Sequence, residues 1–267
     1  MVAVVEVGQI ELDCERSGSG PPLLLIMGLS GTYLHWGEPL LAALRGGFDV
    51  IAYDHRGVGA SSRLEGPITI RELAEDAAGL LSALEIDSAH VLGISMGGMV
   101  AQELALAHPG RLRTLTLGCT YCGGPGSALP RPAVARRLAA AGSQDREQAI
   151  RTSWEVNVSP GFAADEEAWA RFHEIAARRR VALTVIAAQA RAVSQHDTSE
   201  RLGEIAMPTL VIHGTLDEVL PVQNGRVVAE RIPGARLEIF EDVGHLFFWE
   251  RPRRSAELML AHAAAHA

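Results

Sequence analysis

The chain has 267 residues, and all 24 of its basic residues are arginine. Without lysine it has no amine for Schiff-base chemistry, no lysine base for a serine nucleophile and no phosphate-binding P-loop lysine. Its 32 acidic residues give a formal net charge of −8, which argues against a nucleic-acid partner, because such binding needs basic residues that displace counterions.

Cysteine content and hydropathy narrow the class of protein further. Cys14, Cys119 and Cys122 are too few, and odd in number, for a disulfide framework. The Cys119/Cys122 pair has no second ligand pair for zinc, so we expect it to be packed rather than metal-binding or redox-active. Residues 2–7 read as a strand and not as a signal peptide, and no apolar run approaches the roughly 20 residues that span a bilayer. We expect a cytoplasmic protein with no membrane partner.

The first half of the chain alternates short apolar runs with amphipathic helical patterns. Residues 2–6 and 10–15 predict an antiparallel hairpin at the edge of a sheet. Residues 70–84 and 97–108 carry apolar side chains at a spacing of three and four, which predicts core-facing helices. Continuous apolar runs separate these segments, and such runs are typical of parallel strands covered on both faces. They span residues 23–26, 50–53, 90–93 and 112–117.

The second half begins with a change of pattern. Glycine and proline crowd the segment after Cys122, and only helical patterns follow until about Arg201. Strand patterns return at residues 209–213 and 236–240, and a helix closes the chain. The sequence therefore predicts an α/β fold, with a mostly parallel sheet, that is interrupted by one all-helical insertion. The predicted core spans residues 1–122 and 203–267, and the insertion spans residues 123–202.

One serine has the setting of a catalytic nucleophile. Gly93-Ile94-Ser95-Met96-Gly97 is the single Gly-x-Ser-x-Gly of the chain, and it lies between a predicted buried strand and a predicted helix. This strand-turn-helix setting is that of a nucleophile elbow. A side chain at Gly93 or Gly97 would collide with the strained turn or with the neighbouring strand. Ser95 is therefore the candidate nucleophile, and the alternative is a glycine-rich turn with an incidental serine.

A serine nucleophile needs a base, and the base needs an orienting carboxylate. His245 follows the last predicted strand, and Asp217 follows the strand before it, so both should lie with Ser95 at the carboxyl ends of parallel strands. Glu218 and Asp242 are rival acids. Glu218 is adjacent to Asp217 and should point elsewhere, and Asp242 precedes His245 too closely to reach its far nitrogen. Asp217 and His245 are the favoured pair.

The tetrahedral intermediate of acyl transfer needs donors aimed at its oxyanion. The backbone N–H of Met96, directly after the candidate nucleophile, should be one donor. The loop of residues 27–31, which is rich in glycine, should supply the other.

Together these motifs resemble the α/β-hydrolase superfamily over essentially the whole chain. The elbow, the loop of residues 54–61, the Asp217 loop and the Gly244-His245 pair all match family patterns, and the order Ser…Asp…His is the family's order. Within the superfamily the chain is similar to the esterase-like group that includes 3-oxoadipate enol-lactonases, cofactor-free haloperoxidases or perhydrolases, and aclacinomycin-type methylesterases.

The resemblance carries further implications for the loop and for the insertion. It implies that Leu29 supplies the second oxyanion N–H, and that the helical insertion is a cap over the mouth of the active site. The family usually has His-Gly where this chain has Met27-Gly28, so a histidine that often braces the loop is missing.

By this resemblance we expect a serine hydrolase that cleaves a small carboxylic ester or lactone without a metal or other cofactor. His35, Trp36 and Trp154 are candidates to line the substrate pocket, and the plainer interpretation is that they pack the fold. We interpret His55 and His213 as structural. The same triad would serve a perhydrolase or haloperoxidase, an acyltransferase or a carbon–carbon bond hydrolase, and these alternatives stay open. A non-catalytic receptor would have no need of all three triad residues.

Overall fold

A sheet of eight strands forms the centre of the computed structural model, which describes residues 2–178 and 180–266. The strand order is β1-β2-β4-β3-β5-β6-β7-β8, with β1 and β2 antiparallel to their neighbours and the remaining strands parallel to one another. The predicted α/β fold is confirmed. The strands are β1 (Val2–Val7), β2 (Ile10–Gly18), β3 (Pro22–Ile26), β4 (Asp49–Tyr53), β5 (Ala89–Ile94), β6 (Leu112–Gly118), β7 (Thr209–Gly214) and β8 (Arg236–Phe240).

The predicted edge hairpin is confirmed, with a longer second strand than the local pattern indicates. β1 pairs with β2 in a register that sets Val2 opposite Glu15. β2 continues to Gly18 because its other edge pairs with β4, where Gly18 lies opposite Asp49. Hydrophobic alternation along one strand does not reveal such a distant partner.

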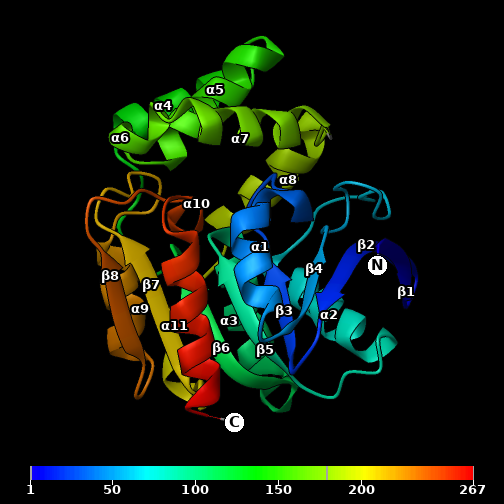
Figure 1. Ribbon diagram of the computed structural model, residues 1–267. Helices are drawn as coiled ribbons and strands as arrows, with labels where there is room; N and C mark the ends of the chain where they lie inside the picture. The colour runs from blue at the N-terminus through cyan, green and yellow to red at the C-terminus, as the bar shows by residue number, and fades with distance from the viewer. Residues whose placement is uncertain (1, 179, 267) are drawn as a thin grey trace.

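Helices cover both faces of the sheet (Figure 1). Side chains alternate along each strand, so in β3 Leu24 and Ile26 join the core under α2, α3 and α9, while Leu23 and Leu25 join the core under α1 and α11. Because there is a core on each face of the sheet, the side chains on both sides of a central parallel strand are buried, and these strands are apolar over most of their length. No helix in the described ranges is both long and apolar enough to cross a membrane. These core helices are α1 (Glu38–Arg45), α2 (Ile70–Ala83), α3 (Met96–Ala107), α9 (Gln223–Arg231), α10 (Phe247–Glu250) and α11 (Pro252–Ala264).

The segment between β6 and β7 is helical and lies across one end of the sheet (Figure 1). Trp154 is its most deeply buried aromatic residue, and its ring contacts Phe172 of the same segment and Trp249 of α10. This shared aromatic cluster attaches the helical segment to the core. The helices are α4 (Pro132–Ala141), α5 (Arg146–Asn157), α6 (Pro160–Ala163), α7 (Glu166–Arg178) and α8 (Leu183–Ser194), all within residues 123–202.

Candidate active site

Ser95 occupies a strained turn between β5 and α3. Its backbone has φ 52° and ψ −122°, a region that residues with a side chain rarely adopt. The turn is held by the Ser95 N–H, which donates to Gly118 O at 2.9 Å, and by the Thr120 hydroxyl, which donates to Ser95 O at 2.7 Å. A Cβ at Gly97 would lie 2.0 Å from Ile26 O of β3. The crowding that the sequence predicts around the elbow is thus confirmed.

Asp217 and His245 meet in the interior of the protein. The His245 Nδ1–H donates to Asp217 Oδ2 at 2.7 Å, and both side chains are almost completely buried. The other carboxylate oxygen, Asp217 Oδ1, accepts the N–H groups of Val219 at 2.9 Å and Leu220 at 2.8 Å. Three hydrogen bonds, two from the loop after β7 and one from the histidine, therefore constrain this carboxylate.

The two rival acids lie elsewhere. The carboxylate of Glu218 is exposed and forms an ion pair with Arg131 at 3.1 Å. Asp242 has a backbone φ of 57° and uses its N–H to bind the Thr215 hydroxyl at 2.9 Å. Of the three candidate acids, Asp217 is the one whose carboxylate the structure brings to His245.

Electrostatics in this buried pair favour a charged carboxylate. Burial raises the pKa of Asp217, but the facing His245 and the hydrogen bonds from His213 and His245 outweigh burial and lower that pKa to about 2. Burial lowers the pKa of His245, but the Asp217 carboxylate outweighs it and holds that pKa well above the ordinary 6.5. The Cys119 side chain also contacts the His245 ring, and burial raises the pKa of its thiol, so it faces the ring as a neutral group.

The two backbone donors predicted for the oxyanion hole belong to segments that adjoin the serine. Met96 begins α3, so its N–H belongs to the first turn and has no helical acceptor. A Cβ at Gly28 would lie 3.1 Å from Ser95 Cβ, which shows how closely the 27–31 loop approaches the serine. In that loop the N–H of Ser30 donates to Gln189 Oε1 at 2.9 Å, whereas no acceptor is found for the Leu29 N–H within the described part of the chain.

A different histidine braces this loop. The His55 ring lies with Nε2 3.0 Å from the carbonyl oxygen of Met27, and it is buried beside Tyr53. The loop that lacks the family's usual histidine is therefore supported from the end of β4. This contact with the Met27 carbonyl is consistent with the interpretation of His55 as a structural residue.

Known proteins share this architecture over the full length of the chain. A family model for the alpha/beta hydrolase fold matches residues 21–252. The chain belongs to the alpha/beta hydrolase family. It is 32% identical over 256 residues, 95% of each chain, to the putative carbamate hydrolase RutD of Azorhizobium caulinodans.

Other relatives differ in the activity that their names state. Identity is 32% over 271 residues, 96% of this chain and 92% of the relative, to the 2-hydroxy-6-oxononadienedioate/2-hydroxy-6-oxononatrienedioate hydrolase of Paraburkholderia xenovorans. The crystal structure of the enol-lactonase from Burkholderia xenovorans LB400 superposes with a TM-score of 0.85 at 26% identity, covering 98% of this chain and all of the other. The relatives are hydrolases that act on different substrates.

In this alpha/beta hydrolase two of the candidate pocket residues, His35 and Trp154, pack against the same ring, Phe172. The His35 ring forms an edge contact with Phe172 at 5.7 Å, and Thr32 N–H donates to its Nδ1 at 3.0 Å. Burial lowers the pKa of His35 to about 4, so the ring is neutral. Trp36 and Trp154 are buried to 1% and 0% exposure, and Trp154 Nε1–H donates to Ala163 O at 3.2 Å. Contact of these three side chains with substrate stays a prediction.

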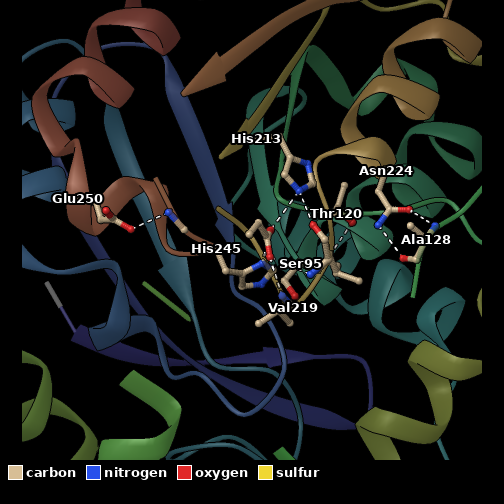
Figure 2. Close-up of polar contacts among 11 residues, drawn as sticks. Ser95, Thr120, Ala128, His213, Val219, Asn224, His245 and Glu250 are labelled. Atoms are coloured by element: carbon tan, nitrogen blue, oxygen red, sulfur yellow. Dashed lines mark hydrogen bonds and ion pairs between the residues drawn. The ribbon is translucent and has the colours of Figure 1, made fainter. Parts of the chain in front are cut away.

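The structure of this hydrolase also brings to the site His213, which the sequence analysis interpreted as structural, and Glu250, which it did not single out. His213 Nε2 lies 3.0 Å from Asp217 Oδ2, and Figure 2 shows His213 and His245 on opposite sides of that group of contacts. Glu250 Oε1 accepts the N–H groups of Gly244 and Ser159, both at 2.8 Å. In the sequence, His213 is only a histidine at the end of an apolar strand, and Glu250 is only a glutamate after three aromatic residues. Neither pattern indicates which residue the side chain will contact.

Proposed function

We propose that this hydrolase cleaves a carboxylic ester or lactone through a serine–histidine–aspartate triad and an acyl-enzyme intermediate. The observation that carries the proposal is the buried 2.7 Å hydrogen bond from His245 Nδ1 to Asp217 Oδ2, next to a serine held at φ 52°. A strained serine beside an oriented imidazole is the arrangement that nucleophilic acyl transfer requires.

In this mechanism Ser95 Oγ attacks the carbonyl carbon while His245 Nε2 takes the hydroxyl proton. The N–H groups of Met96 and Leu29 stabilise the negative oxygen of the tetrahedral intermediate. The intermediate collapses, the carbon–oxygen bond breaks, and the alcohol oxygen takes the proton from His245. The alcohol departs from an ester, whereas from a lactone it stays attached to the acyl chain. Water then attacks the acyl-enzyme with His245 as base, and the carboxylic acid is released.

Asp217 serves this sequence in two ways. Its bond to Nδ1 fixes the ring so that Nε2 can receive the serine proton, and its charge stabilises the imidazolium that forms. The low pKa of Asp217, about 2, keeps the carboxylate charged throughout the neutral range.

The kind of bond that is cleaved is proposed from the similarity to known hydrolases. The enol-lactonase structure, which aligns with 98% of this chain, supports a lactone or ester. The Paraburkholderia relative at 32% identity favours a second candidate, hydrolysis of a carbon–carbon bond in a vinylogous diketone with the same triad. Both candidates place the same three side chains in the same roles.

The test is a panel of p-nitrophenyl esters of rising chain length, several lactones and one vinylogous diketone, with Ser95→Ala as the control. We expect the wild type to hydrolyse members of the ester or lactone series and the control to lose that turnover. Equal turnover by Ser95→Ala would overturn the mechanism. Rapid cleavage of the diketone, with no turnover of any ester or lactone, would select the carbon–carbon candidate.

A further inference from the structure

The oxygen that orients His245 is shared with a second histidine. His213 lies in β7 and is fully buried, with Nε2 3.0 Å from Asp217 Oδ2 and 2.6 Å from the carbonyl oxygen of Leu220. His245 Nδ1 approaches the same Oδ2 at 2.7 Å. Figure 2 shows His213 and His245 reaching this point from different segments, close to Ser95. One carboxylate oxygen thus lies between two imidazole rings.

The contacts of His213 determine which ring nitrogen carries the hydrogen. Nε2 faces two acceptors, a carboxylate oxygen and a carbonyl oxygen, so it must be the donor. Nδ1 is buried and has no hydrogen-bond partner among the described residues. A hydrogen on Nδ1 would therefore be buried without an acceptor. The ring holds the tautomer that donates to Asp217.

The neighbouring helix is shaped around this ring. A Cβ at Gly225 of α9 would lie 2.7 Å from His213 Nδ1 and 3.0 Å from its Cγ. Gly225 lies in the first turn of α9, and any larger residue here would push the ring from its position. Gly225 therefore leaves space for His213 in the orientation that reaches Asp217.

A purely packing role does not account for a histidine here. An apolar side chain such as leucine would fill this interior position without burying an unpaired ring nitrogen, and burying such a nitrogen is unfavourable. The favourable contact that the imidazole adds is through Nε2, whose N–H donates to the carbonyl of Leu220 at 2.6 Å and which lies 3.0 Å from Asp217 Oδ2. Leu220 in turn donates its own N–H to Asp217 Oδ1.

We propose that His213 is a positioning residue that holds Asp217 Oδ2 against His245 by donating its Nε2–H to that oxygen. The inference rests on the proposed triad function. It makes the histidine pair asymmetric, because His245 exchanges protons with substrate groups while His213 only orients the carboxylate between them.

Three substitutions separate hydrogen bonding from packing. His213→Leu removes the donor and keeps an apolar filler. His213→Gln places an amide N–H as many bonds from Cβ as Nε2, so it can reach Asp217, whereas His213→Asn places its amide at the Nδ1 position and falls short. We expect kcat for the best ester or lactone to fall about 10- to 100-fold in the leucine and asparagine variants, with KM little changed. The glutamine variant should recover most of the loss.

The pH profile supplies a readout that packing would not move. When Asp217 is less well held, its pairing with His245 weakens and the pKa of His245 falls, so the acid limb of kcat/KM should shift to lower pH in His213→Leu and return in His213→Gln. A leucine variant with wild-type kcat and an unmoved limb would overturn the proposal, even if it melts at a lower temperature. Equal rescue by asparagine and glutamine would overturn it as well.

A second measurement needs no turnover and keeps the two proposals separate. The low-field proton resonance of the His245 Nδ1–H, assigned by its absence in His245→Ala, should weaken or shift upfield in His213→Leu and persist in His213→Gln. Gly225→Ala, which presses on the ring from α9, should change the resonance in the same direction, while Gly203→Ala, which meets open space, should not. An unchanged resonance in both His213→Leu and Gly225→Ala would contradict positioning. The expected changes in a protein that hydrolyses no panel substrate would contradict only the proposed function.

Discussion

At the scale of single residues, the Asp217 carboxylate is the most constrained group of the site. Backbone N–H groups of Val219 and Leu220 bind one of its oxygens. The other accepts the His245 Nδ1–H at 2.7 Å and lies 3.0 Å from His213 Nε2. Each donor stabilises the charged form, so the carboxylate stays ionised although it is buried. The roles that we propose for His245 and Asp217, as base and orienting acid, lead to measurable consequences for the pH profile and for substitutions.

The first prediction concerns pH. His245 must be neutral to accept the Ser95 proton, and its pKa is raised well above 6.5 by Asp217. Activity should therefore be present at high pH and be lost as the pH falls through that raised pKa. A profile of kcat/KM for a neutral ester should show an acid limb above pH 6.5. An acid limb below that value would contradict the strong pairing of His245 with Asp217.

The second prediction separates the candidate acids. Asp217→Asn keeps the shape of the side chain but removes its charge and favours the wrong tautomer of His245, so kcat should fall about 10³- to 10⁴-fold. Glu218→Gln is the matched control, because Glu218 is the adjacent acid and pairs with Arg131 at the surface. It should retain wild-type kcat. Comparable losses in both variants, measured with the same ester, would remove the special role of Asp217.

At the scale of elements, strand ends and helix starts determine where the chemistry lies. β5 delivers Ser95 to the start of α3, β7 precedes the Asp217 loop, and the His245 loop follows β8. The buried apolar runs that form these strands could be predicted from the sequence because their burial is local in pattern. The extension of β2 and the contact between Glu250 and Ser159, which lie 91 residues apart, could not, because they depend on pairing between distant segments.

Adding a methyl group at Gly97, in the turn that carries Ser95, should destabilise the protein. Gly97→Ala would place Cβ 2.0 Å from Ile26 O, so β3 or α3 must shift. We expect the free energy of unfolding to fall by about 3 kcal/mol or more, with loss of activity. Gly110→Ala, whose Cβ would meet nothing within 4 Å, should change stability little. Urea unfolding of both variants checks this, and equal stability of the two would contradict the close packing of the elbow.

Removal of the Glu250 carboxylate should destabilise the loop that carries His245. Glu250 accepts the N–H groups of Gly244 and Ser159 and the Ser159 hydroxyl at 2.5 Å. Glu250→Ala leaves these buried donors unpaired, at about 1–3 kcal/mol for each, and should loosen the loop and lower kcat. Ser159→Ala removes only the hydroxyl and should cost about 1 kcal/mol. Denaturation and kcat measured on both variants test the difference, and a Glu250→Ala protein as stable and active as Ser159→Ala would refute it.

At the scale of the whole molecule, the helical segment between β6 and β7 is joined to the core at several points around the site. Gln189 of α8 binds the Ser30 N–H of the 27–31 loop, and the Leu246 N–H donates to Asn157 O at 2.7 Å. Asn224 and Ala128 exchange two hydrogen bonds at 2.8 and 2.9 Å (Figure 2). The 27–31 loop and the His245 loop are thus both fastened to helices of the insertion. We infer that the insertion serves as a cap whose placement and catalytic geometry depend on each other.

The order of motifs along the chain carried the prediction of this fold and of the three triad candidates. Glycines around Ser95 and acids and histidines after successive strands are local signals with a physical reason. The roles of His213 and Glu250 were not predictable, because a histidine ending an apolar strand has the same local pattern whether it packs or binds a carboxylate. Their partners are known only once the loops are folded together.

The central claim is that Ser95 forms a covalent intermediate, and covalent trapping tests it most directly. The protein is treated with a fluorophosphonate, which phosphonylates an activated serine with loss of fluoride, and its intact mass is measured. With no lysine in the chain, trypsin cleaves only after arginine, and one peptide of residues 72–111 carries Ser95 together with Ser82 and Ser88. The account predicts one adduct per chain, located at Ser95 by fragmentation and absent from Ser95→Ala. No adduct on an enzyme that is hydrolysing its ester, or an adduct that persists in Ser95→Ala, would contradict it.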